Sequence, residues 1–273
     1  MIRSTLSFLC WVVAVVAAII TIPTFWLATH VAEEDGYVKF TSSFVGDVEL
    51  RNALVSQIAD DVVRTGGLPA VVKLPLEGAL RSVVRESARQ PGFVEAWEES
   101  QRRTHQLTFG PDSKTDRLTA DIGPIASFMG KQATKDLPVR VTFPDTLRVP
   151  IYGAPDREVL DQVQQTPERS RLGLLVVVLA SVLCLLFARR RINAIIALAA
   201  GALLTAGLLV FGTRLALPEV LDRTPAPTPF ARQMRDLLVD RASDSLNDWL
   251  LGIAVVAAVV LVLGLLGRAL PQR

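Results

Sequence analysis

The chain has 273 residues, 50% of them hydrophobic, and a mean hydropathy of +0.37. A soluble domain is rarely so apolar, so the composition favours an integral membrane protein. The net charge is only +2, from 29 basic and 27 acidic residues, and no basic patch points to nucleic acid as a partner. Both cysteines, Cys10 and Cys184, fall within apolar runs, which excludes a disulfide framework in an exposed domain.

Four apolar runs are long enough to cross a membrane, which takes roughly 17–25 residues. We expect transmembrane helices at residues 8–29, 171–188, 192–212 and 249–267. The first run could instead be a cleaved signal peptide. Its apolar stretch is longer than usual and no small residue stands just before a cut, so we interpret it as an uncleaved anchor. The apolar cores contain no Asp, Glu, Lys or Arg, which argues against a pump or a proton-coupled transporter.

The distribution of arginine predicts the orientation in the membrane. The segments 1–7, 189–191 and 268–273 carry arginine and no acidic residue, and such segments favour the cytoplasmic side. Four crossings then place both termini in the cytoplasm. The 30–170 domain and the 213–248 loop would lie outside the cell, and the plasma membrane is the expected location.

The first half of the predicted domain has helical spacing. A helix over residues 47–64, capped by Asp47 and broken at 66–69, would bury one apolar stripe. That stripe consists of Leu50, Leu54, Ile58 and Val62. A second helical region reaches about residue 89, and Pro91-Gly92 separates it from a helix that runs to about His105.

The second half changes to short strands. Residues 106–109 and 117–122 read as a hairpin around the turn 110–113. A short helix is expected near 125–129, two further strands at 139–143 and 147–151, and a last helix at 156–165. This order predicts an α+β domain inserted in a four-helix membrane protein.

The outer loop holds Pro225, Pro227 and Pro229 at alternate positions, which favours an extended segment. Phe230 and Met234 then begin an amphipathic helix. This helix would either lie on the membrane surface or cover the domain. Its sequence runs on to Trp249, which suits the membrane interface.

Two stripes of small residues lie within the predicted spans. Small residues four apart let helix backbones approach closely, either within one bundle or at a dimer or partner face. Packing within the bundle is the simpler interpretation. The stripes are Ala180, Cys184 and Ala188, and Ala197, Gly201 and Thr205.

The sequence shows no motif for catalysis, metals or nucleotides. The two histidines, His30 and His105, have no partner ligand at metal spacing. We therefore expect no catalytic residue, no metal and no cofactor. Glu98–Arg102 and Glu99–Arg103 have the i, i+4 spacing of surface ion pairs. Arg102 and Arg103 could instead meet anionic headgroups or a partner's acids.

Several segments together resemble a family of uncharacterised actinobacterial multi-pass membrane proteins. The matching residues are Asp35-Gly36-Tyr37-Val38, the helix over 48–63, the stretch from Val84 through Phe93 and Trp97 to His105, and Thr119-Ala120-Asp121-Ile122-Gly123-Pro124. The resemblance implies an N-terminal span, an extracytoplasmic domain and clustered C-terminal spans in an actinobacterial plasma membrane. It implies no activity.

The sequence favours a non-enzymatic accessory or scaffold protein whose outer domain docks a subunit of a membrane complex, in envelope biogenesis or respiratory assembly. A sensor or receptor for lipid or cell-wall ligands, acting through a partner, is the alternative, and whether a small molecule binds stays open. An enzyme using His105 with Glu98 or Glu99 ranks third, and transport fourth. Membrane lipids are further expected partners. The expected partner or packing contacts are Trp97, Arg102, Arg103, His105, Phe230, Met234 and Trp249.

Overall fold

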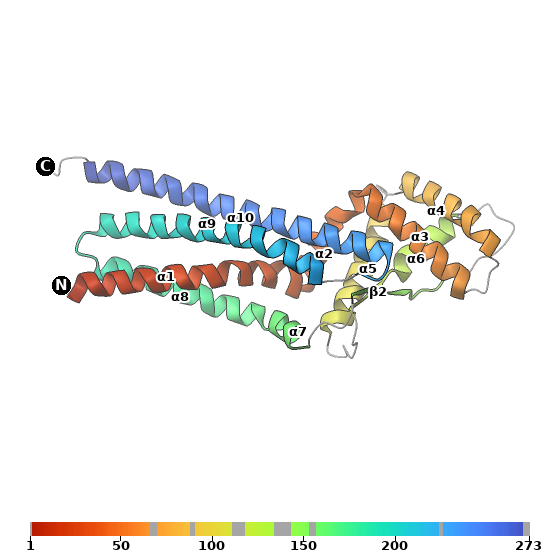
Figure 1. Ribbon diagram of the computed structural model, residues 1–273, viewed down its shortest axis with the longest axis horizontal. Coiled ribbons are helices and arrows are strands. Elements are labelled where there is room, and N and C mark those ends of the chain that lie inside the picture. The colour runs from red at the N-terminus through yellow and green to blue at the C-terminus, as the bar shows by residue number, and fades with distance from the viewer. Residues whose placement is uncertain are drawn as a thin grey trace. The chain divides into compact units, whose positions relative to one another are not determined.

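The structure is a computed structural model, and it describes residues 2–65, 70–87, 91–110, 118–133, 143–152, 157–223 and 226–269. The chain forms two compact units, whose elements are labelled in Figure 1. Unit 1 comprises Met1–Thr29, Val163–Val220 and Asp240–Arg273. Unit 2 comprises His30–Gln162 and Leu221–Val239.

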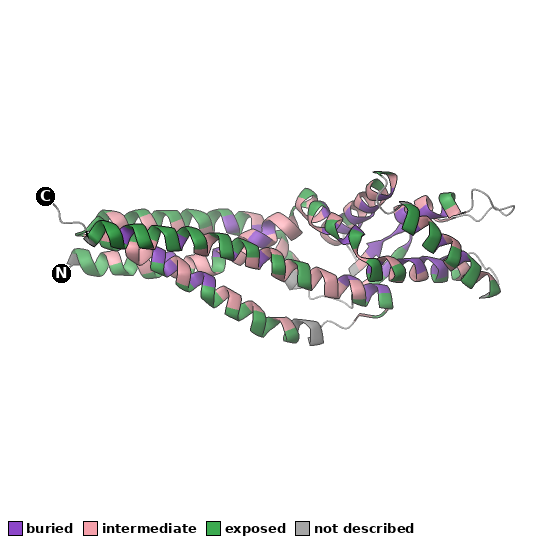
Figure 2. Cartoon of the chain, turned by 90° about the horizontal axis from the view of Figure 1, so that it is seen from above, coloured by how far each residue is buried: buried purple, intermediate pink, exposed green. Residues whose placement is uncertain are grey.

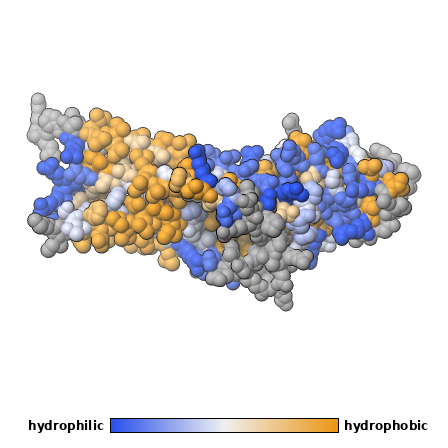
Figure 3. Space-filling view, viewed as in Figure 1, coloured by the Kyte–Doolittle hydropathy of each residue, from blue (hydrophilic) through white to orange (hydrophobic). Residues whose placement is uncertain are grey.

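Among the described residues, four helices are long and apolar enough to cross a membrane, and they cover the four expected spans. Few of their residues are buried, since only 11–28% of the residues in the most apolar stretch of each helix are buried within the protein. The exposed apolar side chains form a hydrophobic band on unit 1 (Figures 2 and 3), as expected of helices whose solvent is lipid. The helices are α1 (Ile2–Leu27), α8 (Thr166–Phe187), α9 (Arg191–Arg223) and α10 (Pro229–Ala269).

Both stripes of small residues pack within unit 1. Ser7 on α1 donates a hydrogen bond to the carbonyl of Cys184 at 3.0 Å. The indole of Trp11 donates to the carbonyl of Ala197 at 2.7 Å. A Cβ atom on Gly201 would lie 2.8 Å from the indole nitrogen of Trp11, so only glycine allows this approach. The small residues of α8 thus let α1 pack closely against that helix, and Gly201 of α9 leaves room for the side chains of Trp11 and Val15.

The expected 213–248 loop is instead helical over most of its described length. Helix α9 runs on to Arg223, and α10 begins at Pro229. Thr228 caps α10, because its hydroxyl accepts a hydrogen bond from the amide of Ala231 at 3.0 Å. The ends of the apolar runs mark where side chains become polar, and a helix can continue past that point. Pro225 lies outside the described residues.

Unit 2 contains most of the remaining helices and both described strands. The helices are α2 (Glu34–Ser42), α3 (Val48–Thr65), α4 (Lys73–Ser87), α5 (Pro91–Phe109), α6 (Gly123–Ala133) and most of α7 (Arg157–Gln164). A π-helical turn, Ala28–Ala32, follows α1, and short 3₁₀ turns occupy Ser43–Gly46 and Ala70–Val72. Helix α2 was not predicted, although Glu34 and Asp35 in its first turn are favourable at a helix N-terminus.

The core of unit 2 contains the predicted apolar stripe of α3. All four stripe residues are at most 2% exposed. The predicted cap is also confirmed, because the Asp47 carboxylate accepts a hydrogen bond from the amide of Leu50 at 2.7 Å. The predicted break at residues 66–69 lies outside the described residues.

The two described strands pair with each other. Strand β1 (Leu118–Asp121) runs antiparallel to β2 (Arg148–Tyr152), with Asp121 opposite Arg148. Strands at 117–122 and 147–151 were predicted, and a two-stranded sheet among helices is compatible with an α+β insert. The predicted hairpin is wrong, because residues 106–109 are the last turn of α5. Residues 111–113 of its turn and 139–142 of the other predicted strand lie outside the described residues.

Candidate functional site

Helix α5 supplies most of the polar side chains that the sequence singled out. Trp97 on this helix is 1% exposed and belongs to the core of unit 2. Its indole nitrogen donates a hydrogen bond to the carbonyl of Thr41 at 3.1 Å. A buried indole N–H needs a partner, and this one joins α5 to the end of α2.

His105 is buried against the π-helical turn. Its Nε2 atom lies 3.1 Å from the carbonyl oxygen of Val31 and 3.1 Å from that of Ala32. Carbonyl oxygens only accept hydrogen bonds, so Nε2 must carry a hydrogen and donate it. His105 therefore supplies a donor to two carbonyls and attaches α5 to this turn.

Tyr37 completes an aromatic cluster around His105. The His105 ring lies 5.4 Å from the Tyr37 ring and 4.9 Å from the Phe109 ring, measured between centroids. The Tyr37 hydroxyl donates a hydrogen bond to the Gln101 side chain at 3.3 Å. Burial around that hydroxyl raises the pKa of Tyr37 to about 12. The phenol thus stays neutral in the folded protein well into the alkaline range.

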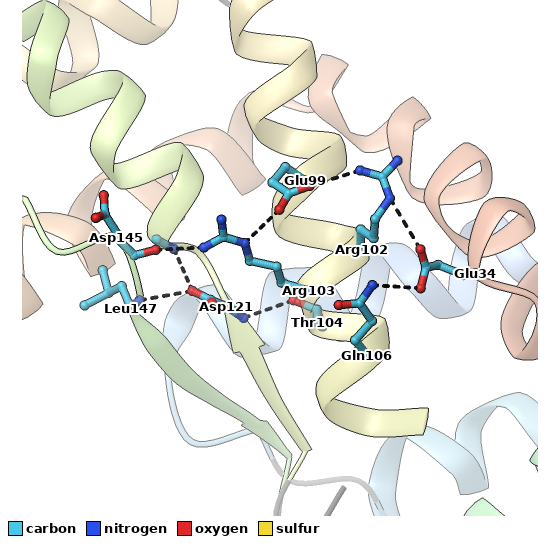
Figure 4. Close-up of polar contacts among 10 residues, drawn as sticks. Glu34, Glu99, Arg102, Arg103, Thr104, Gln106, Asp121, Asp145 and Leu147 are labelled. Carbon is cyan, nitrogen blue, oxygen red and sulfur yellow. Dashed lines mark hydrogen bonds and ion pairs between the residues drawn. The ribbon is translucent and has the colours of Figure 1, made fainter. Parts of the chain in front are cut away.

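A chain of ion pairs, extended by one hydrogen bond to a backbone carbonyl and here called the ionic chain, crosses from α2 over α5 to the segment before β2 (Figure 4). Arg102 lies 3.4 Å from Glu34 and 3.0 Å from Glu99. Arg103 donates to Glu99 at 2.8 Å and to the carbonyl of Asp145 at 3.0 Å. This ionic chain, from Glu34 to Asp145, connects three parts of unit 2.

Glu99 is the centre of the ionic chain. The hydrogen bond from Arg103, followed by that from Arg102, lowers the pKa of the Glu99 carboxyl. The predicted Glu99–Arg103 pair is confirmed, whereas Arg102 pairs with Glu99 and Glu34. All four side chains are 35–41% exposed, so each pair contributes at most about 1 kcal/mol.

Asp121 connects β1 to three neighbouring segments. It is 3% exposed, and one carboxylate oxygen accepts hydrogen bonds from the amides of Gly123 and Leu147, both at 3.0 Å. Its own amide donates to the hydroxyl of Thr104 on α5 at 3.0 Å (Figure 4). Asp121 thereby links β1, the start of α6, the approach to β2 and α5.

Gly123 permits a close backbone approach next to this carboxylate. A Cβ atom there would lie 2.2 Å from the carbonyl oxygen of Asp145, far inside van der Waals contact. The Asp121-Ile122-Gly123-Pro124 segment therefore has a structural explanation, in which Asp121 bonds two amides and Gly123 leaves room for the facing chain.

The other expected contact residues divide between the two units. Phe230 and Met234, at the start of α10, are 2% and 1% exposed and belong to the core of unit 2. The amphipathic segment thus packs on the domain rather than presenting these side chains outward. Trp249 belongs to unit 1, is 39% exposed, and has its ring 5.8 Å from that of Phe25.

The structure does not bring the third-ranked catalytic candidates together. Glu99 bonds two arginines, while the described Nε2 contacts of His105 are to carbonyl oxygens on another element. Within the described ranges, no group of three or more His, Cys, Asp or Glu side chains could hold a metal ion. The described contacts of Glu99 and His105 position helices relative to their neighbours.

Sequence reasoning missed several members of these contacts, namely Glu34, Tyr37, Gln101, Thr104 and Asp145. One signal was present: Trp97, Gln101, His105 and Phe109 recur every four residues, which continues the face of α5 through the segment predicted as a strand. Contacts such as Arg103 with the Asp145 carbonyl had no local signal, because they join segments far apart in sequence.

Comparison with protein-family models, with curated proteins and with solved structures finds no significant match. The likeness to an actinobacterial membrane family therefore stays a prediction from the sequence.

Proposed function

We propose that this chain is a non-enzymatic accessory protein of the plasma membrane, whose unit 2 docks a protein partner outside the cell. The setting would be a membrane complex of envelope biogenesis or respiratory assembly, in an actinobacterial host if the family likeness holds. The orientation rests on the arginine-rich, acid-free segments of unit 1, which favour the cytoplasmic side.

The observation that carries this proposal is how the polar side chains of unit 2 are engaged. His105, Asp121 and Trp97 are buried and bond backbone groups of other elements. Residues in such roles stabilise a domain and leave little of their polar surface for a substrate. A stable, exposed domain on four membrane helices fits a docking role better than a catalytic one.

Two exposed aliphatic side chains offer a contact for the partner. Val71 is 79% exposed and Leu74 is 76% exposed, and among the described residues of unit 2 only Val48, at 59%, is another exposed large aliphatic. Val71 lies in the 3₁₀ turn before α4 and Leu74 in the first turn of α4, and their spacing of three residues places both on one side of the helical segment. We call Val71 and Leu74 the docking pair.

Co-purification in mild detergent, with recovered proteins quantified by mass spectrometry, tests the proposal. The wild-type chain should recover a specific membrane partner. Val71→Ser with Leu74→Ser should lower that recovery about tenfold or more, because burying one Val or Leu side chain contributes about 1.5–3 kcal/mol.

Val48→Ser is the matched control. Val48 is 59% exposed, in the first turn of α3, and lies outside the docking pair. Its substitution should leave recovery unchanged. Recovery of the wild-type chain as a lone monomer would contradict the docking function. If the double variant recovered as much partner as the wild type, the role of the docking pair would be contradicted, while the docking function of unit 2 would stand.

A further inference from the structure

A cavity of about 510 Å³ opens between α1, α8 and α9 in unit 1. Its walls are mainly apolar and include Phe8 and Trp11 of α1. Arg189, Arg190 and Asn193, from the connection between α8 and α9 and the first turn of α9, line it as well. We call it the arginine cavity. Its volume is in the range of roughly 300–1,000 Å³ that is usual for small-ligand sites.

Within the described ranges, no carboxylate pairs with the arginines of this cavity. Residues 1–32, 169–218 and 249–273 contain no Asp or Glu. Among the described residues, no ion pair involves Arg189 or Arg190, and both are exposed. Hydrophilic residues gather at this end of unit 1, next to the apolar band (Figure 3). The charge at the cavity mouth thus lies where a lipid headgroup meets the hydrocarbon.

We propose that the arginine cavity binds an anionic phospholipid, with the headgroup phosphate on Arg189 and Arg190 and an acyl chain along Phe8 and Trp11. Guanidinium groups bind phosphate oxygens by paired hydrogen bonds, and the Asn193 amide supplies a further donor. Basic pockets between transmembrane helices are a recurrent kind of lipid site. A zwitterionic lipid would place a choline cation beside two arginines. This site is independent of the docking function proposed for unit 2.

A free phosphate ion and a whole phospholipid would contact different parts of the cavity, and the apolar walls favour the phospholipid. A free phosphate ion would use only the arginines and leave Phe8 and Trp11 without a partner. The test therefore uses three probes on the full-length chain, delipidated in neutral detergent. They are phosphatidylglycerol, phosphatidylcholine with the same acyl chains, and inorganic phosphate, each titrated and followed by native mass spectrometry.

We expect one phosphatidylglycerol to be retained, with at least tenfold preference over phosphatidylcholine. Arg189→Gln with Arg190→Gln should weaken its binding about 30-fold, because each arginine near an anionic lipid surface strengthens binding roughly five- to sixfold. Arg191→Gln with Arg268→Gln removes the same charge from the start of α9 and the end of α10 without altering the cavity lining, and should change binding less than threefold.

A second variant tests the apolar part of the site. Ala194 is 6% exposed and lines the cavity, so Ala194→Leu should fill it and weaken phosphatidylglycerol binding with both arginines in place. Equal binding of the two lipids, or equal effects of the two arginine pairs, would overturn the proposal. Displacement of the lipid by millimolar inorganic phosphate, with Ala194→Leu unaffected, would also overturn it in favour of a simple anion site.

Discussion

His105 shows how a residue of a type common in catalysis can have a structural role. A histidine on the same helix as Glu98 and Glu99 was the basis of the third-ranked, enzymatic hypothesis. In the structure its Nε2 atom contacts the carbonyls of Val31 and Ala32, while Glu99 bonds Arg102 and Arg103. The direction of each side chain separates the two groups, and residue type and spacing alone do not encode that direction.

His105→Ala should destabilise unit 2 by about 1–3 kcal/mol, because two carbonyls lose a buried donor. Hydrogen exchange of the α5 amides in the full chain measures this local free energy of unfolding. Gln106→Ala, an exposed neighbour on the same helix, should stay within about 0.5 kcal/mol of wild type. Unchanged protection after His105→Ala, combined with loss of function in the cell, would favour the enzymatic interpretation instead.

Glu99 makes stability depend on pH in a direction that follows from its lowered pKa. Arg103 and Arg102 stabilise the ionised carboxylate in the folded state. That stabilisation is present above the pKa of the unfolded chain and is lost as pH falls through the lower folded pKa. Wild type should therefore be more stable than Glu99→Gln at pH 7, by about 1 kcal/mol or less because the site is partly exposed.

The difference in melting temperature between these two proteins should shrink as the solution is acidified below the ordinary pKa of glutamate. Arg81→Gln, which removes an ion pair between exposed Arg81 and partly buried Glu77, controls for general charge effects. A difference that stays constant down to the lowest pH would show that the Glu99 carboxylate does not supply this pH dependence.

At the scale of elements, the sequence predicted those helices and strands that depend on residues close together along the chain. The α3 stripe with its Asp47 cap, the strands β1 and β2, and helix α6 follow from spacing and turn residues within a few positions. The hairpin prediction failed because Thr108 and Phe109 have strand-like composition, while the four-residue repeat through Phe109 continues α5. Pairing of β1 with β2 depends on distant contacts such as that of Asp121 with Leu147.

Gly123→Ala should destabilise unit 2 by about 1–3 kcal/mol, because its Cβ would overlap the Asp145 carbonyl and the backbone would have to shift. Gly78→Ala is the matched control, since nothing lies within 4 Å of a Cβ at that position in α4. Alanine is the better helix former there, and the control should gain about 0.5–1 kcal/mol. Urea unfolding of the full chain measures both, and equal stability of the two variants would refute the close approach at Gly123.

At the scale of the whole molecule, hydropathy identified the four membrane helices, and arginine placement predicts which side each end faces. The docking function of unit 2 needs the domain outside the cell. The sequence could not show that α10 is one continuous helix, carrying core residues of unit 2 at its start and an apolar span further on. Its first part is amphipathic and its second part is apolar, so the sequence predicted a separate helix in the outer loop followed by a transmembrane helix.

Labelling of single cysteines in intact cells tests the orientation most directly. In a chain with Cys10→Ala and Cys184→Ala, Val48→Cys reports on unit 2 and Arg191→Cys on the start of α9, and both positions are exposed. A membrane-impermeant maleimide should label Val48→Cys in intact cells, and Arg191→Cys only after the membrane is permeabilised. Labelling in the reverse order would contradict the account.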